Sequence, residues 1–134
     1  MRAWVVTVLA ALSFGTSRTP VEIVRTWYPS GAPRDERRYL HGRETGVHRG
    51  WWEDGTRRFH YTYVDGRLDG RALDWFRDGT PYRDFHYAAG HEDGRERMWY
   101  ADGTLRANYV ARDGRRFGLM GAKGCVTEDR EPAR

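Results

Sequence analysis

The sequence predicts an all-β fold built from tandem β-hairpins. A tryptophan recurs at a constant step of 24 residues, and three columns of glycine keep the same step. Asp-Gly pairs, which are typical of tight hairpin turns, recur along the chain, and no stretch has a helical period long enough to compete. The tryptophans are Trp27, Trp51, Trp75 and Trp99. The glycine columns are Gly31, Gly55, Gly79 and Gly103; Gly42, Gly66, Gly90 and Gly114; and Gly46, Gly70, Gly94 and Gly118.

The N-terminus differs from the array that follows it. Arg2 precedes an apolar run at 3–14, which has the length of a signal-peptide core and is too short to span a bilayer. We expect residues 1–17 to be a cleaved signal peptide, because the repeat register begins only after them. The protein would then be periplasmic or secreted. The alternative is a buried first strand in a cytoplasmic protein.

The repeat array is expected to cover residues 18–126, in units at 27–50, 51–74, 75–98 and 99–122, with 22–26 as the strand that starts the first unit. Each unit predicts a strand, a tight turn, a second strand and a looser turn. A closing strand is expected at 119–126, where Lys123 replaces the tryptophan. The tail at 127–134 has nothing to bury and is expected to be disordered.

The first turn of each unit can be assigned a type. Proline at position 29 fits a type I turn, and Gly31 two residues later fits the left-handed residue of a bulge. We therefore expect this turn to be a three-residue loop. Such a loop places Trp51 on the same face as Phe59, Tyr61 and Tyr63, and we expect this face to be the packed one.

The opposite face is expected to carry the aromatic residue that follows each tryptophan. We interpret this column, together with nearby polar residues, as a candidate binding row, since exposed aromatic and arginine side chains are typical of protein-binding surfaces. The row consists of Tyr28, Trp52, Phe76, Tyr100, Arg58, His60 and Arg106. The tryptophan and glycine columns are interpreted as structural.

The sequence shows no cluster of residues that is typical of a catalytic or metal-binding site. No two histidines share a repeat column, and no Cys–His cluster suggests zinc. The acidic residues sit mostly in turns, where local hydrogen bonds explain them. We therefore expect no enzyme, no catalytic residues, no metal and no cofactor.

The chain carries 23 basic and 19 acidic residues, for a net charge of +4. The two signs are interleaved along the array, and no basic block stands out. Because phosphate binding needs a continuous positive surface, we expect no nucleic-acid partner.

The repeat resembles a known family. The pattern is two aromatics, any residue and Asp-Gly, followed by tyrosine and by Gly-x-x-x-Gly. It runs through Trp51-Trp52-Glu53-Asp54-Gly55 with Tyr63, Gly66 and Gly70, and the units around it repeat it, although Ala111 stands where the fourth tyrosine is expected. This pattern resembles the MORN repeat in its bacterial variant.

The resemblance implies a single-layer, twisted antiparallel meander that acts as a scaffold or binding surface. Bacterial arrays of this kind are often labelled as antitoxins or immunity proteins, so a toxin is the most concrete protein partner. The alternative is a module that attaches to a membrane or cell wall through phospholipid or glycan. Cell-wall-binding repeats have a similar texture, but their step is shorter and they lack the Gly-x-x-x-Gly element.

Overall fold

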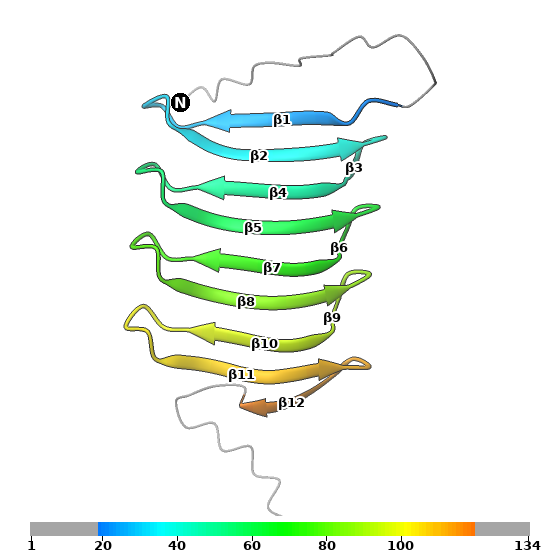
Figure 1. The fold of residues 1–134 in the computed structure, drawn as a ribbon, viewed down its shortest axis with the longest axis vertical. Coiled ribbons are helices and arrows are strands. Elements are labelled where there is room, and N and C mark those ends of the chain that lie inside the picture. Colours follow the sequence, from blue (N-terminus) through cyan, green and yellow to red (C-terminus); the bar gives the residue numbers. More distant parts are fainter. Residues whose placement is uncertain (1–18, 120–134) are drawn as a thin grey trace, which may run out of the picture.

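A computed structural model describes residues 19–119 as one open, antiparallel β-sheet without helices (Figure 1). The expected signal peptide at 1–17 and the expected tail at 127–134 lie outside the described residues. So does the expected closing strand at 119–126, apart from Leu119. The last described strand starts earlier, at Arg115, because it pairs back on its neighbour directly after a two-residue turn.

Twelve strands make up the sheet. The first strand of each hairpin ends at a repeat tryptophan: β1 (Glu22–Trp27), β4 (Gly46–Trp51), β7 (Gly70–Trp75) and β10 (Gly94–Trp99). The second strands are β2 (Pro33–Leu40), β5 (Arg57–Val64), β8 (Pro81–Ala88) and β11 (Leu105–Arg112). Short returning strands are β3 (Arg43–Glu44), β6 (Arg67–Leu68) and β9 (His91–Glu92), and β12 (Arg115–Leu119) closes the described sheet.

The strands follow one another as a meander in the order β1-β2-β4-β5-β7-β8-β10-β11-β12. The short strands β3, β6 and β9 pair only with the strand before them. Successive hairpins therefore lie side by side. The first turn of each unit lies on the same side of the sheet, at one end of the strands, and we call this side the turn edge (Figure 1). The hairpins keep the 24-residue step of the sequence, so the predicted all-β array of hairpins is confirmed.

The first turn of each unit has the predicted three-residue form. In the second unit the Gly55 N–H donates to the Trp52 carbonyl, and the Trp52 N–H donates to the Thr56 carbonyl. Gly55 has a φ of 87°, which is a left-handed conformation that glycine adopts without steric cost. The Asp54 carboxylate accepts the Thr56 N–H at 2.9 Å and so completes the turn.

The second turn is tighter than expected. Its two central residues both have positive φ, as a type I′ hairpin turn requires, and the predicted looser turn is wrong. The turns stack on one another, since the Gly66 N–H donates to the Glu44 carbonyl and the Gly90 N–H to the Leu68 carbonyl. The pairs are His41-Gly42, Asp65-Gly66, Ala89-Gly90 and Asp113-Gly114.

Ala89 is poorly suited to its turn. It has a φ of 48°, where an alanine Cβ crowds the following carbonyl, whereas asparagine tolerates this region. We expect Ala89→Asn to raise the free energy of unfolding by about 0.5–1 kcal/mol in urea titrations. The reverse change in the neighbouring turn, Asp65→Ala, should lower it by a similar amount. Equal effects of Ala89→Asn and Ala89→Val would contradict this explanation.

The faces of the sheet differ from the prediction because a second bulge follows each tight turn. Trp51 pairs with Arg57, but Gly50 pairs with Phe59, so Arg58 has no partner across the hairpin. The same register shift occurs in all four hairpins. In each hairpin, the second residue of the second strand has no partner on the first strand. The residues left out are Arg34, Arg58, Tyr82 and Arg106.

This extra residue reverses the side on which the tryptophans lie. Trp51 shares its face with Arg49 and His60, and not with Phe59, Tyr61 and Tyr63 as predicted. We call the tryptophan side the arginine face. Across the strand centres it carries the cross-strand row Arg25, Glu36, Arg49, His60, Leu73, Asp84, Arg97 and Asn108.

The other side, which we call the aromatic face, contains the core. Buried Phe85 and Tyr109 meet at 6.1 Å with their rings nearly perpendicular, and Ala72, Ala107 and Ala111 pack around them. At the other end of the sheet, His48 lies between Tyr39 and Tyr63. Aromatic rings thus replace a second layer, since each buries a large area.

Candidate functional site

The predicted binding row, apart from His60, lies along the turn edge, beside the first turn of each unit. Each of its aromatic side chains packs against the unpaired residue of the bulge in the same hairpin. The guanidinium of Arg58 lies 5.0 Å from the Trp52 ring centre, and that of Arg106 lies 5.6 Å from the Tyr100 ring centre. Phe76 packs on Tyr82 at 5.0 Å, and Arg34 lies over Tyr28 at 5.9 Å.

These side chains also link neighbouring hairpins. The Tyr28 hydroxyl donates to the Trp51 carbonyl at 3.0 Å, and Trp52 Nε1 donates to the Trp75 carbonyl at 3.3 Å. The aromatic residues are half-buried, and Arg77 of the next turn covers Trp52 from another side. The row therefore holds the turn edge together. His60 lies apart from it, in the central row of the arginine face.

The arginine face is organised around two buried carboxylates. Glu36 accepts hydrogen bonds from Arg25 at 2.8 Å and from Arg49 at 3.0 Å, with Arg38 at 3.6 Å. The Arg25 and Arg49 guanidinium groups come from the two neighbouring strands, so one carboxylate bridges three strands.

Asp84 repeats the arrangement two hairpins further on. It accepts two bonds from Arg71, at 2.7 and 2.9 Å, and one from Arg97 at 2.7 Å. The Arg71 guanidinium lowers the pKa of Asp84 most, and Arg97 adds to this against the opposing effect of burial. Glu36 also has a lowered pKa, because Arg25 and Arg49 outweigh the effect of its burial.

Tryptophans support the same arginines from the turn side. The Arg49 guanidinium lies 5.6 Å from the Trp51 ring centre, and that of Arg97 lies 5.4 Å from the Trp99 ring centre. Such stacking adds about 0.5–1 kcal/mol at exposed sites. Each guanidinium is thus fixed by a carboxylate and a ring while about half of its side chain stays exposed.

Charge is segregated between the two faces. Around the strand centres, the arginine face has two carboxylates, Glu36 and Asp84, against a larger set of arginines: Arg25, Arg38, Arg49, Arg71, Arg95 and Arg97. The aromatic face carries most of the other strand carboxylates, among them Asp35, Asp74, Glu92 and Glu96. Charges that alternate along the chain therefore separate in space around the strand centres.

His60 sits within this positive surface. Burial and the neighbouring Arg57 and Arg49 all lower its pKa, so the imidazole is neutral at physiological pH. It adds an uncharged hydrogen-bonding group to the centre of the arginine face.

On the aromatic face, Asp74 and Glu96 differ in their partners. Asp74 binds the Tyr61 hydroxyl and accepts Arg83 Nε at 2.7 Å. Burial raises the pKa of Tyr61, and Asp74 raises it further, so the phenol stays protonated. Glu96, fully buried, accepts the backbone N–H of His86.

Within residues 19–119, no group of three or more His, Cys, Asp or Glu side chains could hold a metal ion. Over the same range, no helix is long and apolar enough to cross a membrane.

No protein-family model matches the chain, and no curated protein matches it. The MORN resemblance therefore stays a prediction from the repeat pattern.

Sequence reasoning missed the central row of the arginine face. Its signal is present, because Arg25, Arg49 and Arg97 each stand two residues before a repeat tryptophan. Two residues on the same strand share a face, so this column belongs with the tryptophans. Only Leu73 interrupts it.

Proposed function

We propose that this protein is a non-catalytic binding module whose arginine face docks an acidic surface of a partner protein. The observation that carries the proposal is the excess of half-exposed guanidinium groups, held by carboxylates, on one face of an open sheet. Arginine presents a planar fork of donors that matches carboxylates, and it is enriched where protein interfaces concentrate their binding energy.

The fixation of the arginines supports a protein partner. A guanidinium held by a buried carboxylate and a ring loses little side-chain freedom on binding, which favours a partner with carboxylates at matching positions. Lipid headgroups in a fluid membrane can rearrange around mobile arginine side chains. Holding the guanidinium groups in fixed positions would therefore strengthen membrane binding less than it strengthens binding to a protein. A toxin, the partner class that MORN-type arrays of bacteria imply, is the first candidate to test.

The second candidate is an anionic membrane. The positive charge of the arginine face favours it, because basic side chains near an anionic surface each contribute about 1 kcal/mol. Vesicles that contain phosphatidylserine distinguish the two candidates. Tight, salt-sensitive binding to these vesicles with no stoichiometric protein complex would support the membrane and contradict the protein partner.

The test of the arginine face is a pair of charge reversals. With the product of the adjacent gene as the first partner, we expect Arg49→Glu combined with Arg97→Glu to weaken binding at least 100-fold in calorimetric titrations, or about 3 kcal/mol. Arg37→Glu on the aromatic face reverses one charge in the same way and should leave affinity within about threefold.

The predicted turn-edge row gives a competing outcome. If Trp52→Ala weakens this complex and the double charge reversal does not, the docking surface is the turn edge. Thermal melts of all variants separate loss of binding from loss of folding.

A further inference from the structure

The first strand of the sheet has one open side. β1 lies at one end of the sheet and, among the described residues, pairs with β2 alone (Figure 1). Directly after β1, the Tyr28 N–H donates to the Ala32 carbonyl across the hairpin at 2.8 Å. Backbone groups alternate between the two sides of an antiparallel strand, so those of Ile23, Arg25 and Trp27 point away from β2. β1 therefore presents a row of backbone donors and acceptors with which a further strand can pair.

Apolar side chains follow this open side. Val21, Ile23 and Trp27 are 47%, 37% and 42% exposed. They stand at alternate positions, with Arg25 between them, and so lie on the arginine face. β1 contains no proline and no lysine, the residues that often block pairing at the edge of a sheet. Open backbone groups and exposed apolar side chains thus occur together, as is typical of an association site.

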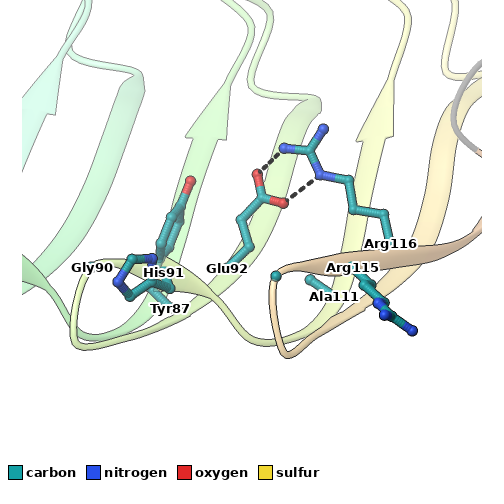
Figure 2. A pocket seen from close by; sticks show the side chains of 8 residues that line it. Tyr87, Gly90, His91, Glu92, Ala111, Arg115 and Arg116 are labelled. Carbon is teal, nitrogen blue, oxygen red and sulfur yellow. Dashed lines mark hydrogen bonds and ion pairs between the residues drawn. The ribbon is translucent and has the colours of Figure 1, made fainter.

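The opposite edge of the sheet, β12, is less suited to pairing. Two adjacent arginines point to opposite sides of this strand, and Arg116 donates two hydrogen bonds to Glu92, at 2.9 and 3.0 Å (Figure 2). Gly118 has a φ of 129°, which departs from an extended strand. Charged side chains and irregular backbone are means by which proteins keep sheet edges apart. Association through a sheet edge is therefore expected at β1.

We propose that β1 pairs with β1 of a second copy of this chain, so that two sheets join into one dimeric sheet. A two-fold axis normal to the sheet makes the two strands antiparallel and keeps both arginine faces on one side. An even number of antiparallel steps separates β1 from β12, so these strands run in the same direction. Joining β12 to β1 with the faces aligned would therefore need parallel pairing, which the described sheet does not use.

The two-fold axis also restricts the register. It maps each face onto itself, so a residue of the arginine face lies opposite another residue of that face. With Val24 opposite its own copy, Ile23 lies opposite Arg25, and Val21 lies opposite Trp27. Sliding the second strand by two residues in one direction would place Arg25 opposite Arg25, whose like charges repel. Sliding it in the other direction would separate Trp27 from Val21, so the first register is favoured.

Sedimentation equilibrium of the full chain tests the dimer, which stands without the proposed function. We expect a dissociation constant in the micromolar range, since one pair of edge strands buries less area than a standard interface. Ile23→Lys should weaken the dimer about tenfold or more, because lysine at an edge resists pairing. Phe117→Lys makes the same charge change at an exposed apolar residue of β12 and should leave the dissociation constant unchanged. The reverse pattern would place the interface at β12.

Hydrogen exchange gives a readout that is specific to strand pairing. The amides of Ile23 and Arg25 should become protected as the protein concentration rises, whereas those of Val24 and Thr26, which point toward β2, should be protected at every concentration. Ile23→Pro removes one outward N–H and no bond to β2, so it should abolish the dimer and leave the monomer folded.

A disulfide tests the register. In a Cys125→Ser background, Val24→Cys should form a covalent dimer on mild oxidation, because residues opposite each other at the axis come within the range of a disulfide. Thr26→Cys lies opposite Glu22 of the second copy and should not.

A chain that stays monomeric at millimolar concentration, or a dimer whose Ile23 and Arg25 amides exchange freely, would overturn the proposal. Protection of these two amides in a monomer would overturn it too, since a segment of the same chain would then occupy the open side of β1.

Discussion

Glu96→Gln is expected to stabilise the protein above neutral pH. The Glu96 side chain is 0% exposed, and its carboxylate accepts the His86 N–H at 2.9 and 3.1 Å without an arginine in hydrogen-bond range among the described residues. Burial raises its pKa from 4.5 to about 7, and Glu92 and Asp84 add to this against the His86 N–H. Deprotonation of this group therefore costs the folded state free energy.

The sign follows from proton binding. Between about pH 4.5 and 7 the folded protein holds a proton that the unfolded chain has released, so stability falls as the pH rises through this window. Above pH 7, the loss of stability that results from the raised pKa of Glu96 amounts to about 3 kcal/mol. Glutamine keeps an acceptor for the His86 N–H, but its amide nitrogen lacks a partner, which costs about 1 kcal/mol. A net gain of about 2 kcal/mol remains.

Urea unfolding at pH 4.5 and at pH 8.5 checks this prediction. The gain should be present at pH 8.5 and absent at pH 4.5, where Glu96 is protonated in the folded protein. Glu53→Gln, which changes an exposed carboxylate in a turn, should have no effect at either pH. A gain of the same size at both pH values would show that deprotonation of Glu96 is not the cause.

The hairpins could be predicted because glycine marks their turns. Gly55 and Gly66 both adopt the positive φ for which the sequence selects them, so the strand boundaries follow closely. The second bulge has no such marker. Its extra residue is arginine or tyrosine, as in Arg58 and Tyr82, and neither reveals that the partner strand skips it. The sequence therefore predicts the wrong face of the sheet for the tryptophans.

The candidate sites depend on spatial neighbours that lie one repeat or more apart. Arg71 and Arg97 meet at Asp84 from different strands, although nothing in their local sequence connects them. Ala111 is visible in the sequence as a departure from the repeat. The ion pair that Arg116 forms with Glu92 beside this alanine could only come from the structure.

Asp84→Asn is expected to have the largest destabilising effect. Asp84 is 3% exposed and holds Arg71 and Arg97, so it joins β7, β8 and β10 across the middle of the sheet. Removing one partner of a buried ion pair costs about 3–5 kcal/mol, and the half-exposed arginines reduce this because water can solvate them. We expect a loss of about 2–3 kcal/mol at pH 7.

The pH dependence distinguishes this loss from a general packing defect. Arg71 and Arg97 hold the pKa of Asp84 below its ordinary value of 3.8, so its stabilisation is present above that pH and is lost as the pH falls through the folded pKa. Wild type and Asp84→Asn should therefore converge in stability toward pH 2 and diverge toward pH 7, which urea titrations across this range can measure. A constant difference at every pH would mean that the asparagine disturbs packing and that the ion pairs contribute little. Glu53→Gln, at an exposed turn position, controls for the loss of one negative charge.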